Sequence, residues 1–290
     1  MIMKKSKKLL RKVLAGTLAL TVVSGVTLST TVGSLVGANT VVSASYYADS
    51  NPHYYTSDDG INYTYWIKSD GTAQVINYYG IPKTITTWYF PSVVDGRTVT
   101  TIGYDSGYTS TSLWNHNLEN VTEIVIPDTV EELSNLAFNG VSKLKSIILP
   151  KNLKKIGFGA FYDCSSLQSI FLPDSIEEIG ERAFGECKAL TSIQFPVGLK
   201  SVESYAFMDC QNLKNVGFPF TVETVHDNTF YGIILESLQI DNPNVVFEES
   251  LYRTDKILAL EGSDIQKQVE EHNSTNLYFS KETLNKSMYS

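Results

Sequence analysis

The feature that most restricts the fold of this 290-residue chain is an internal repeat with a period of 23 residues. The prolines that recur at this step are Pro127, Pro150, Pro173, Pro196 and Pro219, and Pro243 follows after 24 residues. The phenylalanines that recur at the same step are Phe138, Phe161, Phe184, Phe207 and Phe230. Self-similarity at a fixed period of this length indicates a stacked array, because one such unit cannot bury its apolar face alone.

Each position of the repeat has a physical role. A unit ends in L-x-x-I-x-L, as in Leu144, Ile147 and Leu149, and this alternation predicts a short strand with one buried face. Proline ends the strand because it cannot donate the next ladder hydrogen bond. The segment after it carries apolar residues three apart, such as Ile176 and Ile179, and then Ala-Phe. We predict turns and short 3₁₀ or helical structure there.

The consensus P-x-x-(V/I/L)-x-x-(I/V/L)-x-x-x-A-F-x-x-C-x-x-L-x-x-I-x-(L/F) resembles the BspA-type leucine-rich repeats of bacterial surface proteins. The resemblance covers the five units of 127–242 and is weaker at 91–103 and 251–258. It implies a leucine-rich-repeat solenoid of the α/β type, with short parallel strands on the concave face and 3₁₀ or turn segments opposite. It also implies a surface or secreted protein, often linked to adhesion. The family motif is structural and supplies no catalytic residues.

Residues 1–44 are typical of a secretory signal peptide. Six basic side chains precede an apolar run that is diluted by Gly, Ser and Thr, and Val42-Ser43-Ala44 fits the small-x-small cleavage rule. The alternative is a retained membrane anchor, but the weak hydrophobes and the cleavage site favour removal and no stable membrane insertion afterwards. The length of the basic and apolar regions indicates a Gram-positive exporter.

Charge restricts the class of partner. Residues 1–44 hold six of the 23 basic side chains and none of the 31 acidic ones, so the remainder has 17 basic, 31 acidic and a net charge of −14. This balance argues against nucleic acid or an anionic membrane as partner. It fits an acidic solvated surface, or else a basic partner.

The flanks of the repeats are expected to close the array. We predict a polar linker at 45–60, and a hairpin cap with a degenerate first repeat at 61–126, in which Val99 and Ile102 correspond to Val130 and Leu133. A closing hairpin is expected at 243–260 and a polar tail at 261–290. There is no Leu-Pro-x-Thr-Gly-like motif and no apolar tail, so we expect release, or non-covalent retention at the cell surface.

The first repeat contains eight extra residues, near 109–117. Insertions in repeat arrays form loops and often carry recognition. Trp114 in this loop is either a contact for a glycan or protein, or a side chain that folds back over the open edge of the array. The second interpretation is favoured.

No catalytic or metal-binding set emerges from the sequence, and we expect neither enzyme activity nor a cofactor. The cysteines, Cys164, Cys187 and Cys210, share one repeat position that holds Leu118 and Val141 upstream, so they are expected to be buried free thiols. A Cys164–Cys187 bridge is the alternative, since stacked strands lie about 4.8 Å apart. Acidic and basic pairs at one repeat position, such as Glu177-Glu178 and Lys154-Lys155, predict a surface charge ladder rather than a carboxylate active site.

The strand side chains that point away from the core are the candidate binding surface. One column contains Val125, Ile148 and Phe171, then Gln194, and is bordered by Ser169 and Ser192. Exposed adjacent apolar residues usually mark a binding site. The alternatives are that other residues cover them, or that β-propensity alone selected them.

These patterns lead to a secreted or surface binding protein, expected to be a monomer, that binds a protein through the concave sheet. The second hypothesis is a glycan or cell-wall module that uses the aromatic side chains of the N-terminal region: Tyr63, Tyr65, Trp66, Trp88, Tyr89 and Trp114. A secreted enzyme or toxin is the third and is disfavoured because no catalytic constellation is found.

Overall fold

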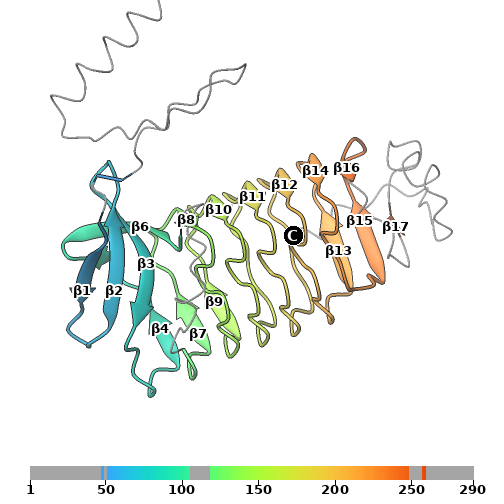
Figure 1. Ribbon diagram of the computed structural model, residues 1–290. Helices are drawn as coiled ribbons and strands as arrows, with labels where there is room; N and C mark the ends of the chain where they lie inside the picture. The colour runs from blue at the N-terminus through green and yellow to red at the C-terminus, as the bar shows by residue number, and fades with distance from the viewer. Residues whose placement is uncertain (1–46, 49–50, 105–117, 248–256, 259–290) are drawn as a thin grey trace, which may run out of the picture.

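The structure is a computed structural model that describes residues 47–48, 51–104, 118–247 and 257–258. These residues form a solenoid in which successive coils lie side by side, as Figure 1 shows from β6 to β16. The solenoid predicted from the repeat is therefore confirmed. The expected signal peptide (1–44), the loop at 109–117 and the tail at 261–290 lie outside the described residues.

The described strands are short and, apart from those at the N-terminal end, parallel. They are β1 (His53–Thr56), β2 (Asn62–Ile67), β3 (Ala73–Tyr79), β4 (Thr87–Tyr89), β5 (Val93–Val94), β6 (Arg97–Ile102), β7 (Glu123–Val125), β8 (Glu132–Leu133), β9 (Ser146–Ile148), β10 (Lys155–Ile156), β11 (Glu178–Ile179), β12 (Ser201–Val202), β13 (Asn215–Phe218), β14 (Thr224–Val225), β15 (Ser237–Ile240), β16 (Val246–Phe247) and β17 (Ile257–Leu258).

One face of the solenoid is a long sheet with the order β1-β2-β3-β6-β8-β10-β11-β12-β14-β16. From β8 onward it contains one two-residue strand per coil, and Ile102 of β6 pairs with Leu133 in the register expected for the degenerate first repeat. The same inward column continues through Ile156 and Ile179, both fully buried. Each coil therefore adds one buried apolar side chain to a continuous core.

The L-x-x-I-x-L segments form the opposite face. There β4, β7 and β9 form one parallel sheet, and β13, β15 and β17 form another. The coils between them are joined by isolated parallel bridges, Phe171 to Gln194 and Ser192 to Asn215. The period-2 alternation holds, because Ile147 and Ile170 are buried while Ile148 and Phe171 are exposed.

Ala-Phe stands at the corner that joins the two faces. The repeated phenylalanines stack along the axis, with ring centroids 5.8, 5.3, 5.3 and 5.8 Å apart from Phe138 to Phe230. Backbone bonds follow the same direction, and Phe161 N donates to Ala183 O over 2.8 Å. Each corner turns sharply because two residues are left-handed, as in Arg182 (φ 54°) and Glu186 (φ 58°).

The 3₁₀ or helical structure expected after each proline is not found among the described residues. That segment contains a turn and then a two-residue strand, such as β10 or β11. Apolar residues three apart fit a helical turn, but they also fit a turn followed by a strand. The rung-to-rung bonds decide the outcome: Lys154 N donates to Glu131 O at 2.8 Å, and Gly157 N donates to Leu133 O at 2.7 Å.

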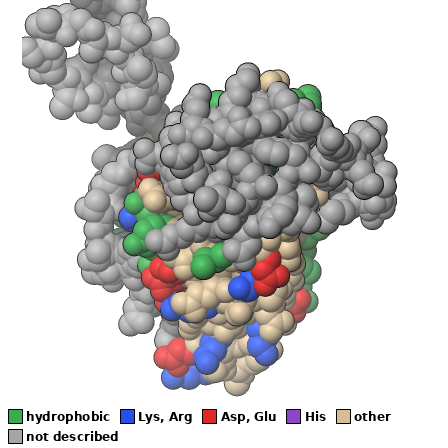
Figure 2. Space-filling model, turned by 90° about the vertical axis from the view of Figure 1, so that its right-hand side faces the viewer, with side chains coloured by type: hydrophobic (Ala, Val, Ile, Leu, Met, Phe, Trp, Pro, Cys, Tyr) green, Lys and Arg blue, Asp and Glu red, His purple; other side chains and the backbone are tan. Residues whose placement is uncertain are grey.

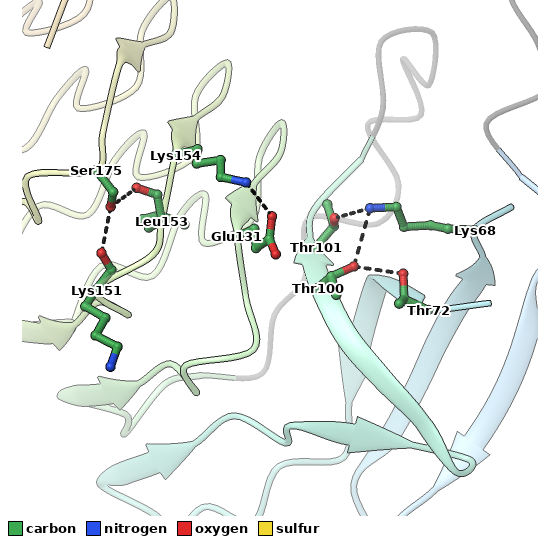
Figure 3. Close-up of polar contacts among 9 residues, drawn as sticks. All are labelled: Lys68, Thr72, Thr100, Thr101, Glu131, Lys151, Leu153, Lys154 and Ser175. Atoms are coloured by element: carbon green, nitrogen blue, oxygen red, sulfur yellow. Dashed lines mark hydrogen bonds and ion pairs between the residues drawn. The ribbon is translucent and has the colours of Figure 1, made fainter. Parts of the chain in front are cut away.

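The N-terminal end carries an antiparallel unit in which β2 pairs with β1 and β3, and β3 then pairs in parallel with β6. The linker expected at 45–60 is therefore wrong at 53–56, where Tyr54 and its neighbours form β1. Turn residues on either side suggested a linker, but Tyr55 also stacks on Tyr63, 6.3 Å away. Lys68 Nζ reaches Thr100 and Thr101 on β6, at 3.4 and 3.3 Å (Figure 3).

The C-terminal strands are also different from the expectation. A hairpin was predicted at 243–260, but β16 pairs in parallel with β14, and β17 pairs in parallel with β15. The two strands therefore lie in different sheets and continue the solenoid. The apolar residues of this segment occupy the same two strand positions as those of the units before it, and stacking on the preceding coil outweighs local hairpin pairing.

Candidate functional site

The candidate binding surface is a row of outward-facing side chains on the sheet made by β4, β7 and β9. Residue pairing places Tyr89 beside Val125, and Val125 beside Ile148. Phe171 lies at the same position of the next coil and bridges to Gln194. Exposed fractions are 71% for Tyr89, 54% for Ile148 and 76% for Phe171, while Val125 is half-buried. We call these four residues, Tyr89, Val125, Ile148 and Phe171, the apolar column.

The residues that border the apolar column are polar and exposed. Ser169 and Ser192 lie two residues before Phe171 and Gln194, and all three polar side chains are accessible. The structure thus brings together all the predicted binding residues except Trp114, which lies outside the described residues. The resulting surface is apolar along the apolar column and carries hydroxyl and amide groups beside it.

Tyr89 is the member of this surface that the binding-site prediction missed. It was assigned to the group of N-terminal aromatics, although it stands two residues before Pro91. Val125, Ile148 and Phe171 stand at the same distance before Pro127, Pro150 and Pro173. That spacing is the signal that identifies it, because it places Thr87–Tyr89 as the first strand of the same sheet.

The aromatic residues of the glycan hypothesis are mostly part of the core. Tyr63, Tyr65, Trp66 and Trp88 are at most 7% exposed, so a glycan cannot stack on them in the folded protein. Burial also raises the pKa of Tyr63 to about 12. Burial, followed by the hydrogen bond to Asp95, raises the pKa of Tyr65 to about 12.

Charged side chains lie on the other sheet. Lys154 contacts Glu131 at 2.8 Å (Figure 3), Lys155 contacts Glu178 at 3.0 Å, and Lys200 contacts Glu177 at 2.6 Å. The predicted charge ladder is therefore confirmed. The hydrogen bond from Lys200 lowers the pKa of Glu177. Acidic and basic side chains also alternate on the C-terminal end seen in Figure 2. Exposed pairs of this kind contribute little to stability.

The cysteines do not form a reactive or metal-binding site. All three are buried free thiols, and Cys187 Sγ donates to Phe161 O of the preceding coil at 3.2 Å. Burial raises the pKa of Cys210 to about 12 and that of Cys164 further. Within the described ranges, no group of three or more His, Cys, Asp and Glu side chains is placed to hold a metal. Those same ranges contain no helix with the length and apolarity to cross a membrane.

We expect the three thiols to be unreactive in the native protein. Near neutral pH a buried thiol with a raised pKa supplies almost no thiolate, which is the form that attacks a disulfide reagent. An aromatic disulfide reagent should therefore label none of Cys164, Cys187 and Cys210 at once in buffer, and all three in concentrated guanidinium chloride. Immediate release of one equivalent from native protein would contradict the buried placement.

Comparison with known proteins agrees with the repeat architecture. The sequence profile of the family described as BspA type leucine rich repeat region matches residues 110–236 and 182–280, with six copies. A crystal structure of a leucine-rich repeat protein from T. pallidum is similar at 25% identity, with 75% of this chain and 96% of that chain covered and a TM-score of 0.51. The pneumococcal vaccine antigen PcpA is similar in fold at 21% identity, with 71% and 60% covered and a TM-score of 0.52. No curated protein matches the chain.

Proposed function

Because this chain belongs to the BspA-type leucine-rich repeat family, we propose that it is a secreted or surface-retained bacterial protein that binds another protein through the apolar column. The observation that carries the proposal is the exposure of Tyr89, Ile148 and Phe171 at one strand position along the same face of the solenoid. Adhesion is the biological role that this activity would serve. The apolar run and cleavage motif of residues 1–44 support export.

The composition of the surface favours a protein ligand. Aromatic residues are enriched at the buried centres of protein interfaces, which are surrounded by polar rims. Tyr89 and Phe171 would supply such anchors, and Ser169, Ser192 and Gln194 would supply the rim. All belong to coils whose backbone is fixed by the stacked core, so little backbone entropy is lost on binding.

A glycan ligand is less well supported, because four of the six aromatic residues assigned to it are buried. Stacking on a sugar ring requires an accessible aromatic face, and among the described members of that set Tyr89 alone has one. Sedimentation with washed cell walls tests this alternative directly. Retention that survives Phe171→Asp and is lost with Trp114→Ala would show that the loop, and not the apolar column, is the binding surface.

We expect Phe171→Asp to weaken binding of a protein ligand at least about tenfold, which is the loss expected for an aromatic anchor at an interface. Phe171 is 76% exposed, so the substitution should leave unfolding within about 0.5 kcal/mol of wild type. The measurement is binding of the purified protein to arrayed extracellular proteins, followed by titration of each ligand found.

The matched control is Phe220→Asp, which makes the same chemical change at a side chain that is 67% exposed and stands in the turn after Pro219. It should bind like wild type. If the folded Phe171→Asp variant binds every ligand as tightly as wild type does, the apolar column is not the binding surface.

A further inference from the structure

A second candidate surface lies at the corner of the solenoid, away from the apolar column. It is a depression of about 380 Å³, lined by Leu136, Asn139, Phe158, Gly159, Tyr162, Arg182 and Met208. This volume is at the lower end of the range of small-molecule sites. We call it the corner depression.

One coil contributes no side chain to the corner depression. Leu136, Gly159, Arg182 and Tyr205 occupy the same left-handed corner position of successive coils, with φ between 54° and 60°. Leu136 N and Gly159 N each donate to a carbonyl of the next coil, so these corners are stacked in register. Gly159 therefore adds no side chain between Leu136 and Arg182, and the end of the Leu136 side chain lies 2.9 Å from where a Cβ would stand. A left-handed φ does not require glycine in this column.

A buried hydrogen-bond donor lies at one end of the corner depression. Asn139 is 5% exposed, and its Nδ2 atom has no hydrogen-bond partner within the described part of the chain. An unsatisfied buried donor of this kind costs about 1–3 kcal/mol. A turn of the amide toward the depression would let Nδ2 donate to a ligand oxygen and remove that cost, so the site favours an acceptor at this end.

A cation lies toward the other end. The guanidinium carbon of Arg182 is 6.0 Å from the ring centre of Phe158 and 5.3 Å from that of Tyr205, so the planar group is held between two aromatic rings. Its Nε atom is 3.7 Å from Glu181, a contact too long for a strong ion pair. No described residue pairs with its two Nη atoms, which remain available for a carboxylate.

The remaining walls are apolar or aromatic. Phe158, Leu136 and Met208 present carbon atoms, and the Tyr162 hydroxyl donates to Glu186. That bond holds the tyrosine ring in place and raises the pKa of Tyr162 to about 12. The hydroxyl therefore stays protonated and adds no negative charge beside a bound anion. Glu186 also contacts Lys188 at 3.4 Å, which offsets part of its charge.

We propose that the corner depression binds a small molecule with an aromatic or apolar body, a carboxylate at one end and a hydroxyl or carbonyl oxygen at the other. The carboxylate pairs with Arg182, the second oxygen accepts from Asn139 Nδ2, and the body contacts Phe158 and Tyr162. Asn139 and Arg182 stand two coils apart, about 10 Å at the usual strand spacing, which fits one ring with a short acid arm.

The test uses para-hydroxyphenylpropionate as the probe, titrated into the full chain and followed by ligand-observed NMR. Saturable binding is expected. The amide of the same probe, which has no charge, should bind at least about tenfold more weakly. Arg182→Gln should weaken the acid to the level of the amide. No saturable binding of the acid, or equal binding of acid and amide, would overturn the proposal.

Three further variants separate a site from a general effect of charge or stability. Lys151→Gln makes the same charge change at an exposed position outside the corner depression and should bind like wild type. Gly159→Asn should abolish binding because the asparagine side chain would occupy part of the corner depression. The backbone tolerates it, since Asn228 has the same left-handed geometry. The added Cβ would come within 2.9 Å of the flexible end of Leu136, which must shift by a small amount. In Asn139→Ala, the probe should bind no more tightly than phenylpropionate, which lacks the hydroxyl.

The same chemistry occurs at the end of a peptide chain, where a carboxylate follows a side chain and a backbone carbonyl. A short peptide with a C-terminal tyrosine and its amidated form distinguish the two sources. Tighter binding of the free-acid peptide than of the small acid would identify a peptide terminus as the ligand. Tighter binding of the small acid would identify a free metabolite-sized carboxylate. If Arg182→Gln affects neither ligand, the assignment of the carboxylate to this residue is wrong.

Discussion

Replacing Phe184 with alanine is expected to lower the free energy of unfolding by about 3–5 kcal/mol, the usual cost of removing a buried aromatic ring. Phe184 is fully buried and lies 5.3 Å from both Phe161 and Phe207. Its loss would leave a cavity between the Phe161 and Phe207 rings of the two neighbouring coils. Denaturant unfolding followed by circular dichroism measures the change.

The location of Phe184 adds a second effect. In a repeat array each unit contacts its neighbours only, so total stability is a sum of unit and interface terms. A cavity at the central interface weakens the link between the two halves, and the unfolding transition should broaden as well as shift. Phe220→Ala is the control, because that ring is 67% exposed and should change stability by no more than about 0.5 kcal/mol. Equal effects of the two substitutions would show that the stacked rings do not hold the coils together.

The repeat made the solenoid predictable, because the same residue types return to the same place in every coil. Proline at the end of each strand and phenylalanine at each corner follow from geometry that one unit already contains. The register of the degenerate first coil was predictable too, since Ile102 pairs with Leu133 as its position in the pattern requires. Burial of Cys164 and its two counterparts followed from the apolar residues at equivalent positions.

The elements that were mispredicted are those in which local pattern and neighbouring coils compete. Ile176 and Ile179, three residues apart, fit a 3₁₀ turn when one unit is considered alone. In the array, Gly180 N donates to Ile156 O at 2.8 Å, and a bond of this kind is available only once the coils stack. The segment at 243–260 was mispredicted for the same reason, since β14 and β15, which pair with its strands, belong to the preceding coil. The strand at 53–56 has another cause: it pairs with the nearby β2, and its turn-rich flanks hid the alternation.

The two candidate sites differ in how far the sequence could reveal them. The apolar column follows from strand alternation, and only the weak first coil hid Tyr89. The corner depression is lined by one glycine that shares its column with Leu136, Arg182 and Tyr205, and by Arg182, whose guanidinium lies near two aromatic rings. A repeat alignment identifies Gly159 as the smallest residue of its column, but the unpaired amide of Asn139 is a property of the folded structure.

Tyr78→Ala is expected to be as destabilising as the loss of Phe184, by about 3–5 kcal/mol, because the residue joins the N-terminal antiparallel unit to the first coils. Its ring is 4.6 Å from Trp88 and 5.9 Å from Phe90, and its hydroxyl donates to Ala137 O at 2.9 Å. Burial raises the pKa of Tyr78 well above its ordinary value, so the hydroxyl remains a donor into alkaline solution.

The variant Tyr78→Phe separates the two contributions. It keeps the ring and leaves the Ala137 carbonyl without this donor, so its cost should be about 1–3 kcal/mol. Tyr54→Ala, at an outward residue of β1 that is 73% exposed, should have almost no effect.

Hydrogen exchange then tests whether the antiparallel unit acts as a cap. An uncovered first coil would expose Val99 and Ile102, which are fully buried in the intact protein. In Tyr78→Ala the amides of β6 and β8 should therefore lose protection before those of β12 and β14, because coils contact only their neighbours and the perturbation enters from one end. Uniform loss of protection along the array would show instead that the solenoid unfolds as one cooperative unit and that its N-terminal end needs no separate cover.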